Sequence, residues 1–194
     1  MYNIVLLPCI FLNALINQIK IRMKKVALFL MTVFYIGAYA QQIPCSNCTY
    51  SITGLDKNNY TLVAGQTLCV TATGILQGTI NLDGGTICNE GVFSPSEFTY
   101  SQGSFNNSSV IIYTGTLNLN ASVNIDNNSS GVMNITGGIN ITNSNVQFSN
   151  NGTLNTTAII VSAGTIINNG IMNYNNLSNN GGTYTNNGTA NCCE

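Results

Sequence analysis

The stretch Asn150-Asn-Gly-Thr-Leu-Asn155 recurs as Asn168-Asn-Gly-Ile-Met-Asn173 and again as Asn186-Asn-Gly-Thr-Ala-Asn191. The three copies start 18 residues apart. Two earlier segments, Gly115-Thr-Leu-Asn118 and Gly131-Val-Met-Asn134, share the glycine, the apolar residue and the final asparagine. A repeat near 18 residues excludes most helical repeat proteins, whose units are about 33 residues or longer.

The residues inside each repeat favour strands and turns. Asn, Gly, Thr and Ile are weak helix formers, and runs such as Val146-Gln-Phe148 alternate apolar and polar residues, as a half-buried strand does. Each Asn-Asn-Gly predicts a tight turn whose glycine takes a positive φ. The sequence therefore predicts an all-β, right-handed parallel β-helix (β-solenoid) with about 18 residues per rung and amide ladders between stacked asparagines. An antiparallel β-sandwich is the alternative, but its turns recur every 8–12 residues or so and would not keep Gly and Asn in phase.

The first 40 residues are predicted to lie outside the folded domain, and most of the second half of them is predicted to direct export. Residues 23–40 have two lysines, an apolar run and the small-residue end Ala38-Tyr-Ala40, which together are typical of a signal peptide cleaved between Ala40 and Gln41. A membrane anchor is the alternative, although the apolar run is shorter than the ~20 residues of a span. Residues 1–22 are interpreted as an over-called gene start. Residues 41–194 then form one solenoid domain, irregular around 89–109, secreted or at the cell surface and without a stable membrane span.

Charge is scarce in this chain. Only 6% of its 194 residues are charged, with five Lys and Arg, six Asp and Glu and no His. After Gln41 the chain has one basic residue, Lys57, and six acidic residues. This charge balance excludes a basic surface for nucleic acid. Without His, a Ser-His-Asp triad and histidine metal ligands are also excluded.

The acids do not recur at the rung period, and we interpret each as a solvated loop residue. They are Asp56, Asp83, Glu90, Glu97, Asp126 and Glu194. The sequence accordingly predicts no catalytic residue, no cofactor and no metal site, and therefore no enzyme.

Six cysteines follow the signal peptide, an even number that suggests disulfides in an exported chain. Gly65-Gln-Thr-Leu-Cys69 matches Gly84-Gly-Thr-Ile-Cys88 at a spacing of 19. Equivalent positions of adjacent rungs lie about 5 Å apart, so we predict a Cys69–Cys88 disulfide. Cys45 and Cys48 form a C-x-x-C, for which a structural disulfide is favoured over a redox or metal half-site. The partners of Cys45, Cys48, Cys192 and Cys193 stay open.

The exposed ladders of Thr, Asn and Ser are uncharged, and such surfaces suit glycans, other cell-surface components, self-association through the terminal rung, or ordered water. Four tyrosines add rings that can stack on sugars: Tyr100, Tyr113, Tyr174 and Tyr184. The alternative for each is a solvated turn residue.

Residues 60–69 (YTLVAGQTLC) and 78–91 (GTINLDGGTICNEG), downstream of a signal peptide, resemble the start of large secreted β-helical surface proteins of the Bacteroidetes. The resemblance covers roughly residues 45–92. It implies a non-catalytic, adhesin-like structural module, and it supplies no catalytic residues. Because such proteins usually continue into a C-terminal sorting domain, this chain is predicted to be a truncated N-terminal portion.

Two other functions stay open. A fragment of a carbohydrate-active β-helix, polysaccharide-binding or lyase-like, would place two acids within about 10 Å on one face. An ice- or surface-binding solenoid would need a regular Thr-x-Thr ladder. Thr183-Tyr-Thr185 fits that pattern, but Thr165-Ile-Ile167 stands one repeat earlier.

Overall fold

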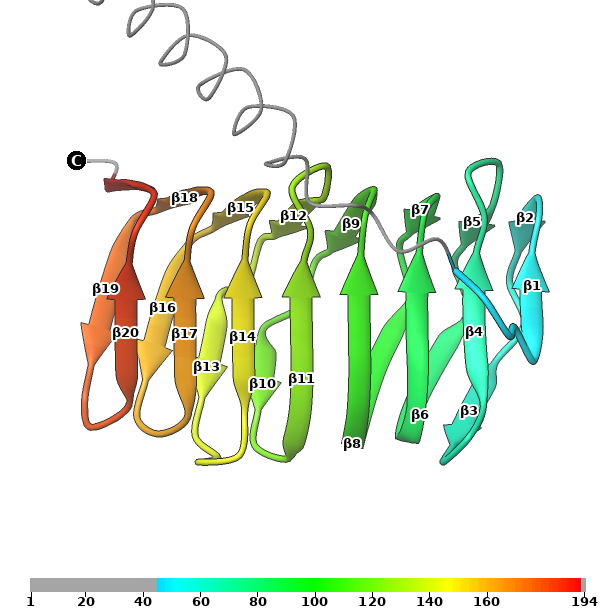
Figure 1. Cartoon of the computed structure of the whole chain (residues 1–194), viewed down its shortest axis with the longest axis horizontal. Helices are drawn as coiled ribbons and strands as arrows, with labels where there is room; N and C mark the ends of the chain where they lie inside the picture. The colour runs from blue at the N-terminus through cyan, green and yellow to red at the C-terminus, as the bar shows by residue number, and fades with distance from the viewer. Residues whose placement is uncertain (1–44, 193–194) are drawn as a thin grey trace, which may run out of the picture. The chain divides into compact units, whose positions relative to one another are not determined.

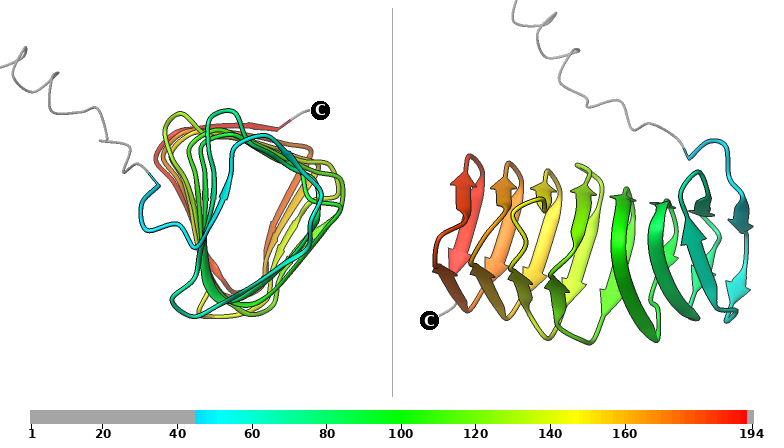
Figure 2. Two further views of the ribbon diagram at one scale, coloured as in Figure 1. Left: turned by 90° about the vertical axis from the view of Figure 1, so that its right-hand side faces the viewer. Right: turned by 90° about the horizontal axis from the view of Figure 1, so that it is seen from below.

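A computed structural model describes residues 45–192, which form a parallel β-solenoid of about eight turns with about 19 residues each. The coils stack along one axis with a roughly triangular outline (Figures 1 and 2). The chain rises along the near strands of Figure 1, returns behind them and advances toward β20, which makes the coil right-handed. The predicted fold class is confirmed. The predicted gene-start segment 1–22, signal peptide 23–40 and cleavage site Ala40–Gln41 lie outside the described residues.

Three parallel sheets run along the solenoid. Sheet A consists of β1 (Tyr50–Ile52), β4 (Thr67–Val70), β6 (Thr79–Asn89), β8 (Glu97–Asn107), β11 (Ser122–Asn127), β14 (Gln147–Asn150), β17 (Thr165–Asn168) and β20 (Thr183–Asn186), with β3 (Tyr60–Val63) paired to β6. Sheet B consists of β2 (Leu55–Asp56), β5 (Ile75–Leu76), β7 (Val92–Phe93), β9 (Val110–Tyr113), β12 (Val132–Ile135), β15 (Thr153–Thr156), β18 (Ile171–Tyr174) and β21 (Thr189–Cys192). Sheet C consists of β10 (Leu117–Leu119), β13 (Ile139–Ile141), β16 (Ala158–Val161) and β19 (Asn176–Asn179).

The core consists of apolar side chains stacked in columns, one residue per coil. In sheet A, strand register places one buried column in contact from β4 to β17: Leu68, Ile87, Phe105, Ile125, Phe148 and Ile166. A single coil could not bury these side chains, because its apolar edge is covered only when neighbours stack above and below it.

A column of buried asparagines runs beside that apolar column, at the last residue of β6, β8, β11, β14 and β17. Asn89, Asn107, Asn127, Asn150 and Asn168 are fully buried. Each side-chain amide donates to the Oδ1 of the next asparagine over 2.7–2.8 Å, and the ladder ends at Asn186. Since every Nδ2 also donates to a main-chain carbonyl, these buried polar groups are satisfied. The predicted amide ladders are confirmed.

Glycine is required in each Asn-Asn-Gly for a different reason from the one predicted. Gly152, Gly170 and Gly188 do not adopt a positive φ. Instead, successive coils approach so closely there that a Cβ on Gly170 would lie 2.1 Å from the carbonyl oxygen of Gly152. Lack of a side chain, and not backbone handedness, selects glycine at this corner.

Residues 89–109, where the sequence predicts an irregularity, lie mainly in strands, and the register of β8 with β6 is interrupted. They contain β7 and the 11-residue strand β8, which pairs with β6 on one side and with β11 on the other. The segment contains Gly and Pro, but β8 continues through Gly103 as one strand. The φ of Gly103 is +133°, and the register with β6 shifts around Asp83.

Candidate functional site

The most distinctive feature of the surface is a break in the strand pairing between β8 and β10. The first half of β8 pairs with β6, from Glu97 opposite Thr79 to Tyr100 opposite Leu82. Strand β10 pairs only with β13, so no ladder joins β8 to β10 within residues 45–192. A cleft of about 360 Å³ opens at the break, lined by Glu97, Phe98, Thr99, Tyr100, Tyr113, Thr116, Asn118 and Asn120.

Three phenylalanines lie beneath the cleft. Phe93, Phe98 and Phe105 pack edge to face, with ring centroids 4.8–5.7 Å apart, and all three are buried. Equivalent core positions in other coils hold mainly Leu, Ile, Val or Met. One of the three, Phe98, also lines the cleft.

Two tyrosines form the aromatic part of the cleft. The Tyr100 ring packs against Phe98 at 5.4 Å. Tyr113 lies over Gly115, where a Cβ would come within 2.9 Å of the Tyr113 Oη. Burial raises the pKa of Tyr100 well above its ordinary value, and Tyr113 adds to the rise. The hydroxyl of Tyr100 is therefore protonated at physiological pH, and it makes no hydrogen bond to another described residue.

The rest of the lining is polar and almost uncharged. Thr99 donates to the Ile80 carbonyl and the Asn81 side chain, and Thr116 donates to the Gly137 carbonyl. Asn118 and Asn120 are exposed on the opposite rim. Glu97 is the one carboxylate among the lining residues. The cleft thus offers aromatic rings, hydroxyls and amides, with one anion at its edge.

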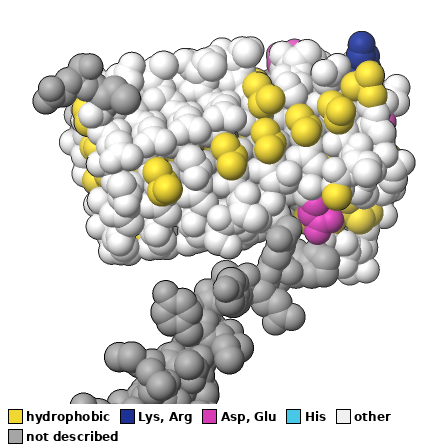
Figure 3. Space-filling model, turned by 90° about the horizontal axis from the view of Figure 1, so that it is seen from above, with side chains coloured by type: hydrophobic (Ala, Val, Ile, Leu, Met, Phe, Trp, Pro, Cys, Tyr) yellow, Lys and Arg dark blue, Asp and Glu magenta, His cyan; other side chains and the backbone are white. Residues whose placement is uncertain are grey.

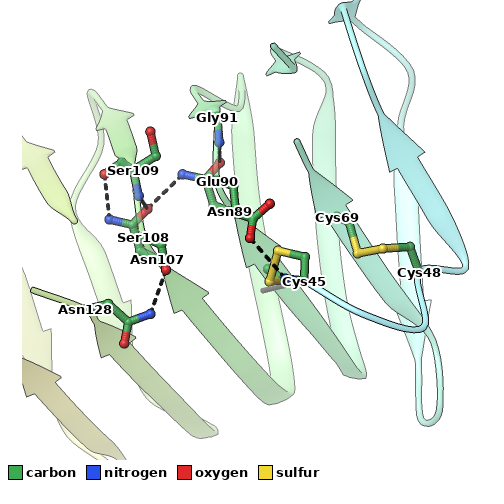
Figure 4. The surroundings of a disulfide bond; sticks show 11 residues. Cys45, Cys48, Cys69, Asn89, Glu90, Gly91, Asn107, Ser108, Ser109 and Asn128 are labelled. Carbon is green, nitrogen blue, oxygen red and sulfur yellow. Dashed lines mark hydrogen bonds between the residues drawn. A yellow bond between two sulfur atoms is a disulfide. The ribbon is translucent and has the colours of Figure 1, made fainter. Parts of the chain in front are cut away.

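The four cysteines near the N-terminus are disulfide-bonded, but the predicted Cys69–Cys88 pairing is wrong. The bonds are Cys45–Cys88 and Cys48–Cys69, with Cα atoms 5.7 and 5.6 Å apart. Cys69 and Cys88 are register partners on β4 and β6, as the repeat predicts. Both face outward, opposite to the inward Leu68 column, and the chain before β1 passes over them and bonds to each (Figure 4).

A signal for this pairing was present in the sequence. Cys45 and Cys48 are three residues apart, and an extended chain advances about 3.3 Å per residue. One C-x-x-C therefore reaches two thiols on neighbouring strands. The strap is held further by Cys45 N–H, which donates to Glu90 Oε1 over 3.1 Å, and by Thr49 N–H, which donates to the Thr67 carbonyl.

The structure brings the four tyrosines singled out by sequence together in two pairs, Tyr100 with Tyr113 at the cleft and Tyr174 with Tyr184 in the last coils. Tyr174 ends β18, and Tyr184 continues the inward sheet A column on β20, both in the last coils. Burial raises the pKa of Tyr184, and Tyr174 adds to the rise. The sequence missed the cleft, although the aromatic density of residues 93–113, with Phe93, Phe98 and Phe105 beside the two tyrosines, marks this coil as different from the others.

The acids that the structure describes do not lie in loops as expected, and Glu194 lies outside the described residues. Asp56, Asp83, Glu97 and Asp126 belong to β2, β6, β8 and β11, and Glu90 follows β6 directly. Tyr60 donates to Asp56 over 2.8 Å, Ser101 contacts Asp83, and Asn151 donates to Asp126 over 3.1 Å. Burial raises the pKa of Asp126, while the hydrogen bond from Asn151 lowers it by less. Within residues 45–192, no three His, Cys, Asp or Glu side chains lie close enough to hold a metal ion.

A row of apolar side chains follows sheet B along the outside of the solenoid. Figure 3 shows it as a file one side chain wide on an otherwise mostly uncharged face. Register places Leu55, Ile75, Val92, Val110 and Val132 in sequence, with Thr153 and then Ile171 continuing the file. Leu55 is the most exposed, at 61%.

Outward asparagines form two further ladders. On sheet B, Asn155 bonds to Asn134, Asn173 to Asn155 and Asn191 to Asn173 over 2.7–2.8 Å. At the corner between sheets A and B, Asn169 bonds to Asn151 and Asn187 to Asn169 over 2.9 Å. In the last coils, sheet B and its corner with sheet A therefore carry two rows of neutral amides held at the strand spacing.

The geometry defines a right-handed parallel β-solenoid with an N-terminal disulfide strap, amide ladders and one lateral cleft. Comparisons with protein-family models, with curated proteins and with solved structures find no match to the chain.

Proposed function

We propose that this chain is a secreted or cell-surface structural and adhesive module that carries out no catalysis. The observation that carries the proposal is the ordered, neutral outer surface, in which asparagine ladders repeat at the strand spacing. A rigid, uncharged array of amide donors and acceptors suits contact with neutral polymers, because a rigid surface loses little conformational entropy on binding.

Export is supported by the disulfides, by the sequence of the first residues and by the resemblance of residues 45–92. The two disulfides suit an oxidising compartment outside the cytosol. The sequence of residues 23–42 has the parts of a signal peptide. No helix within residues 45–192 is long and apolar enough to cross a bilayer. The resemblance of residues 45–92 to β-helical surface proteins of the Bacteroidetes also supports export.

Self-association through the last coil belongs to this proposal. Within the described residues, β19, β20 and β21 each pair with one neighbour only. Unpaired strand edges are templates for another chain, so concentrated protein is expected to form end-to-end assemblies. Light scattering between about 10 and 500 µM (an interval chosen around weak association) measures this, and a concentration-independent monomer contradicts it.

The adhesive role is tested with residues 41–194 produced with both disulfides formed. Binding to insoluble neutral polysaccharides is compared with binding to an anionic one, polygalacturonate. We expect retention on at least one neutral polymer and none on the anionic polymer. Absence of retention on every neutral polymer contradicts adhesion. Release of new reducing ends or unsaturated sugars would instead support a carbohydrate-active β-helix, with Glu97 as the first carboxylate to examine.

A further inference from the structure

We infer that the cleft between β8 and β10 is a binding site for one or two sugar rings of a neutral polysaccharide, gripped between Tyr100 and Tyr113. This inference rests on the proposed adhesive function and names the ligand and the place where it binds. The wider surface then supplies repeated weak contacts, and the cleft supplies recognition.

The size of the cleft sets the size of the ligand. Its volume of about 360 Å³ is at the lower end of small-molecule sites, which run from about 300 to 1,000 Å³. The opening is also short, because β8 and β11 pair directly from Gln102 opposite Ser122 onward. The walls therefore close to one strand spacing within a few residues of Tyr100. For a peptide to add as a strand, the walls of the cleft would have to stay two strand spacings apart along the whole length of the peptide. A compact sugar ring therefore fits better than an added strand.

The lining matches the chemistry of a sugar. A pyranose has an apolar face of C–H groups surrounded by hydroxyls, and tyrosine combines an apolar ring with a polar tip in the same way. The Tyr100 and Tyr113 hydroxyls make no hydrogen bond to other described side chains, and the exposed amides of Asn118 and Asn120 stand on the facing rim. These groups both donate and accept, as sugar hydroxyls do.

Charge selects against acidic sugars. Glu97 lies at the edge of the cleft, and Lys57, the one base within residues 45–192, lies between β2 and β3 in the first coils. A carboxylated sugar would meet a like charge and no partner, and uncompensated like charges across an interface disfavour binding. The ligand is therefore a neutral saccharide.

The test uses residues 41–194 with both disulfides formed and isothermal titration with cellotetraose, xylotetraose and mannotetraose, with tetragalacturonate as the acidic comparison. We expect at least one neutral tetrasaccharide to bind and tetragalacturonate not to bind. Tyr113→Phe and Asn118→Ala each remove one hydrogen-bonding group and should weaken binding about tenfold. The matched controls, Tyr174→Phe and Asn176→Ala, alter the last coils and should leave affinity unchanged.

Asn118→Trp provides a variant that fills the cleft from an exposed position, and it should abolish binding while the thermal midpoint stays near that of the native chain. The assignment is overturned if the cleft variants and the control variants lose affinity equally. It is also overturned if no neutral tetrasaccharide binds. Binding of an extended peptide in place of sugars overturns it too. Retention on solid polysaccharide is measured separately, so adhesion that survives Asn118→Trp rejects the cleft and leaves the adhesive function standing.

Discussion

The side-chain amide of Asn127 donates to Oδ1 of Asn150 over 2.7 Å, although 23 residues separate the two. Elsewhere in this ladder the separation is 18 or 20 residues. The additional residues of the longer coil are therefore placed in its corners, and the ladder keeps the same spacing. A buried amide column thus fixes the register of coils that differ in length.

Asn127→Ala should be strongly destabilising. Truncation removes the acceptor of Asn107 and the donor to Asn150, and each buried polar group left without a partner costs about 1–3 kcal/mol. We expect the free energy of unfolding to fall by about 2–5 kcal/mol in a urea titration. Asn186→Ala, at the exposed end of the same ladder, should cost less than about 1 kcal/mol. Similar losses at the two positions would show that burial of the ladder contributes nothing.

The strap formed by Cys45 and Cys48 should stabilise the first coils selectively. Its disulfides close loops with sequence separations of 43 and 21 residues, for which chain entropy gives about 3–4 kcal/mol each. Because each solenoid coil contacts only its neighbours, reduction should increase amide exchange in β1, β4 and β6 far more than in β14 and β17.

Hydrogen exchange with and without dithiothreitol measures this difference. Strands β14 and β17, which lie far along the solenoid from both disulfides, serve as the internal control and should exchange at the same rate in both states. Uniform loss of protection along the solenoid after reduction would contradict a local role of the strap.

The sequence was sufficient to predict the coil because the same physical demands recur in every rung. The amide ladder requires asparagine at the same position of successive coils, as at Asn150, Asn168 and Asn186. The period is therefore visible in the sequence. The cleft has no such repetition, since residues such as Phe98, Tyr100 and Tyr113 that line it do not recur at the coil period. The disulfide pairing was also inaccessible from register alone, because register places Cys69 beside Cys88 but does not reveal that a strap covers both.

Gly170→Ala tests the close approach between coils. A Cβ there would lie 2.1 Å from the carbonyl oxygen of Gly152, so successive coils must separate at this corner. Overpacking of this kind costs about 1–3 kcal/mol, which a lower thermal midpoint measures. At Gly54 no atom lies within 4 Å of an added Cβ and the φ is not positive, so Gly54→Ala should be neutral or slightly stabilising. A drop of equal size at Gly54 would reject steric contact as the cause.

Asp126 should make the solenoid less stable at neutral pH than at acid pH. Burial raises the pKa of its carboxyl in the folded chain, so the ionised form is disfavoured there relative to the unfolded chain. The penalty is present above the folded pKa and disappears as the pH falls through it toward the ordinary aspartate value of about 4.

Asp126→Asn removes the ionisation and keeps an oxygen that can accept from Asn151. We expect the variant to melt at a higher temperature than the native chain at pH 7, and the two midpoints to converge near pH 3, where the native carboxyl is protonated. Glu97→Gln is the matched control, because it neutralises an exposed carboxylate on β8 and should not reproduce this pH-dependent difference. A native chain that is stabilised by Asp126 at pH 7 would show that the hydrogen bond from Asn151 outweighs burial.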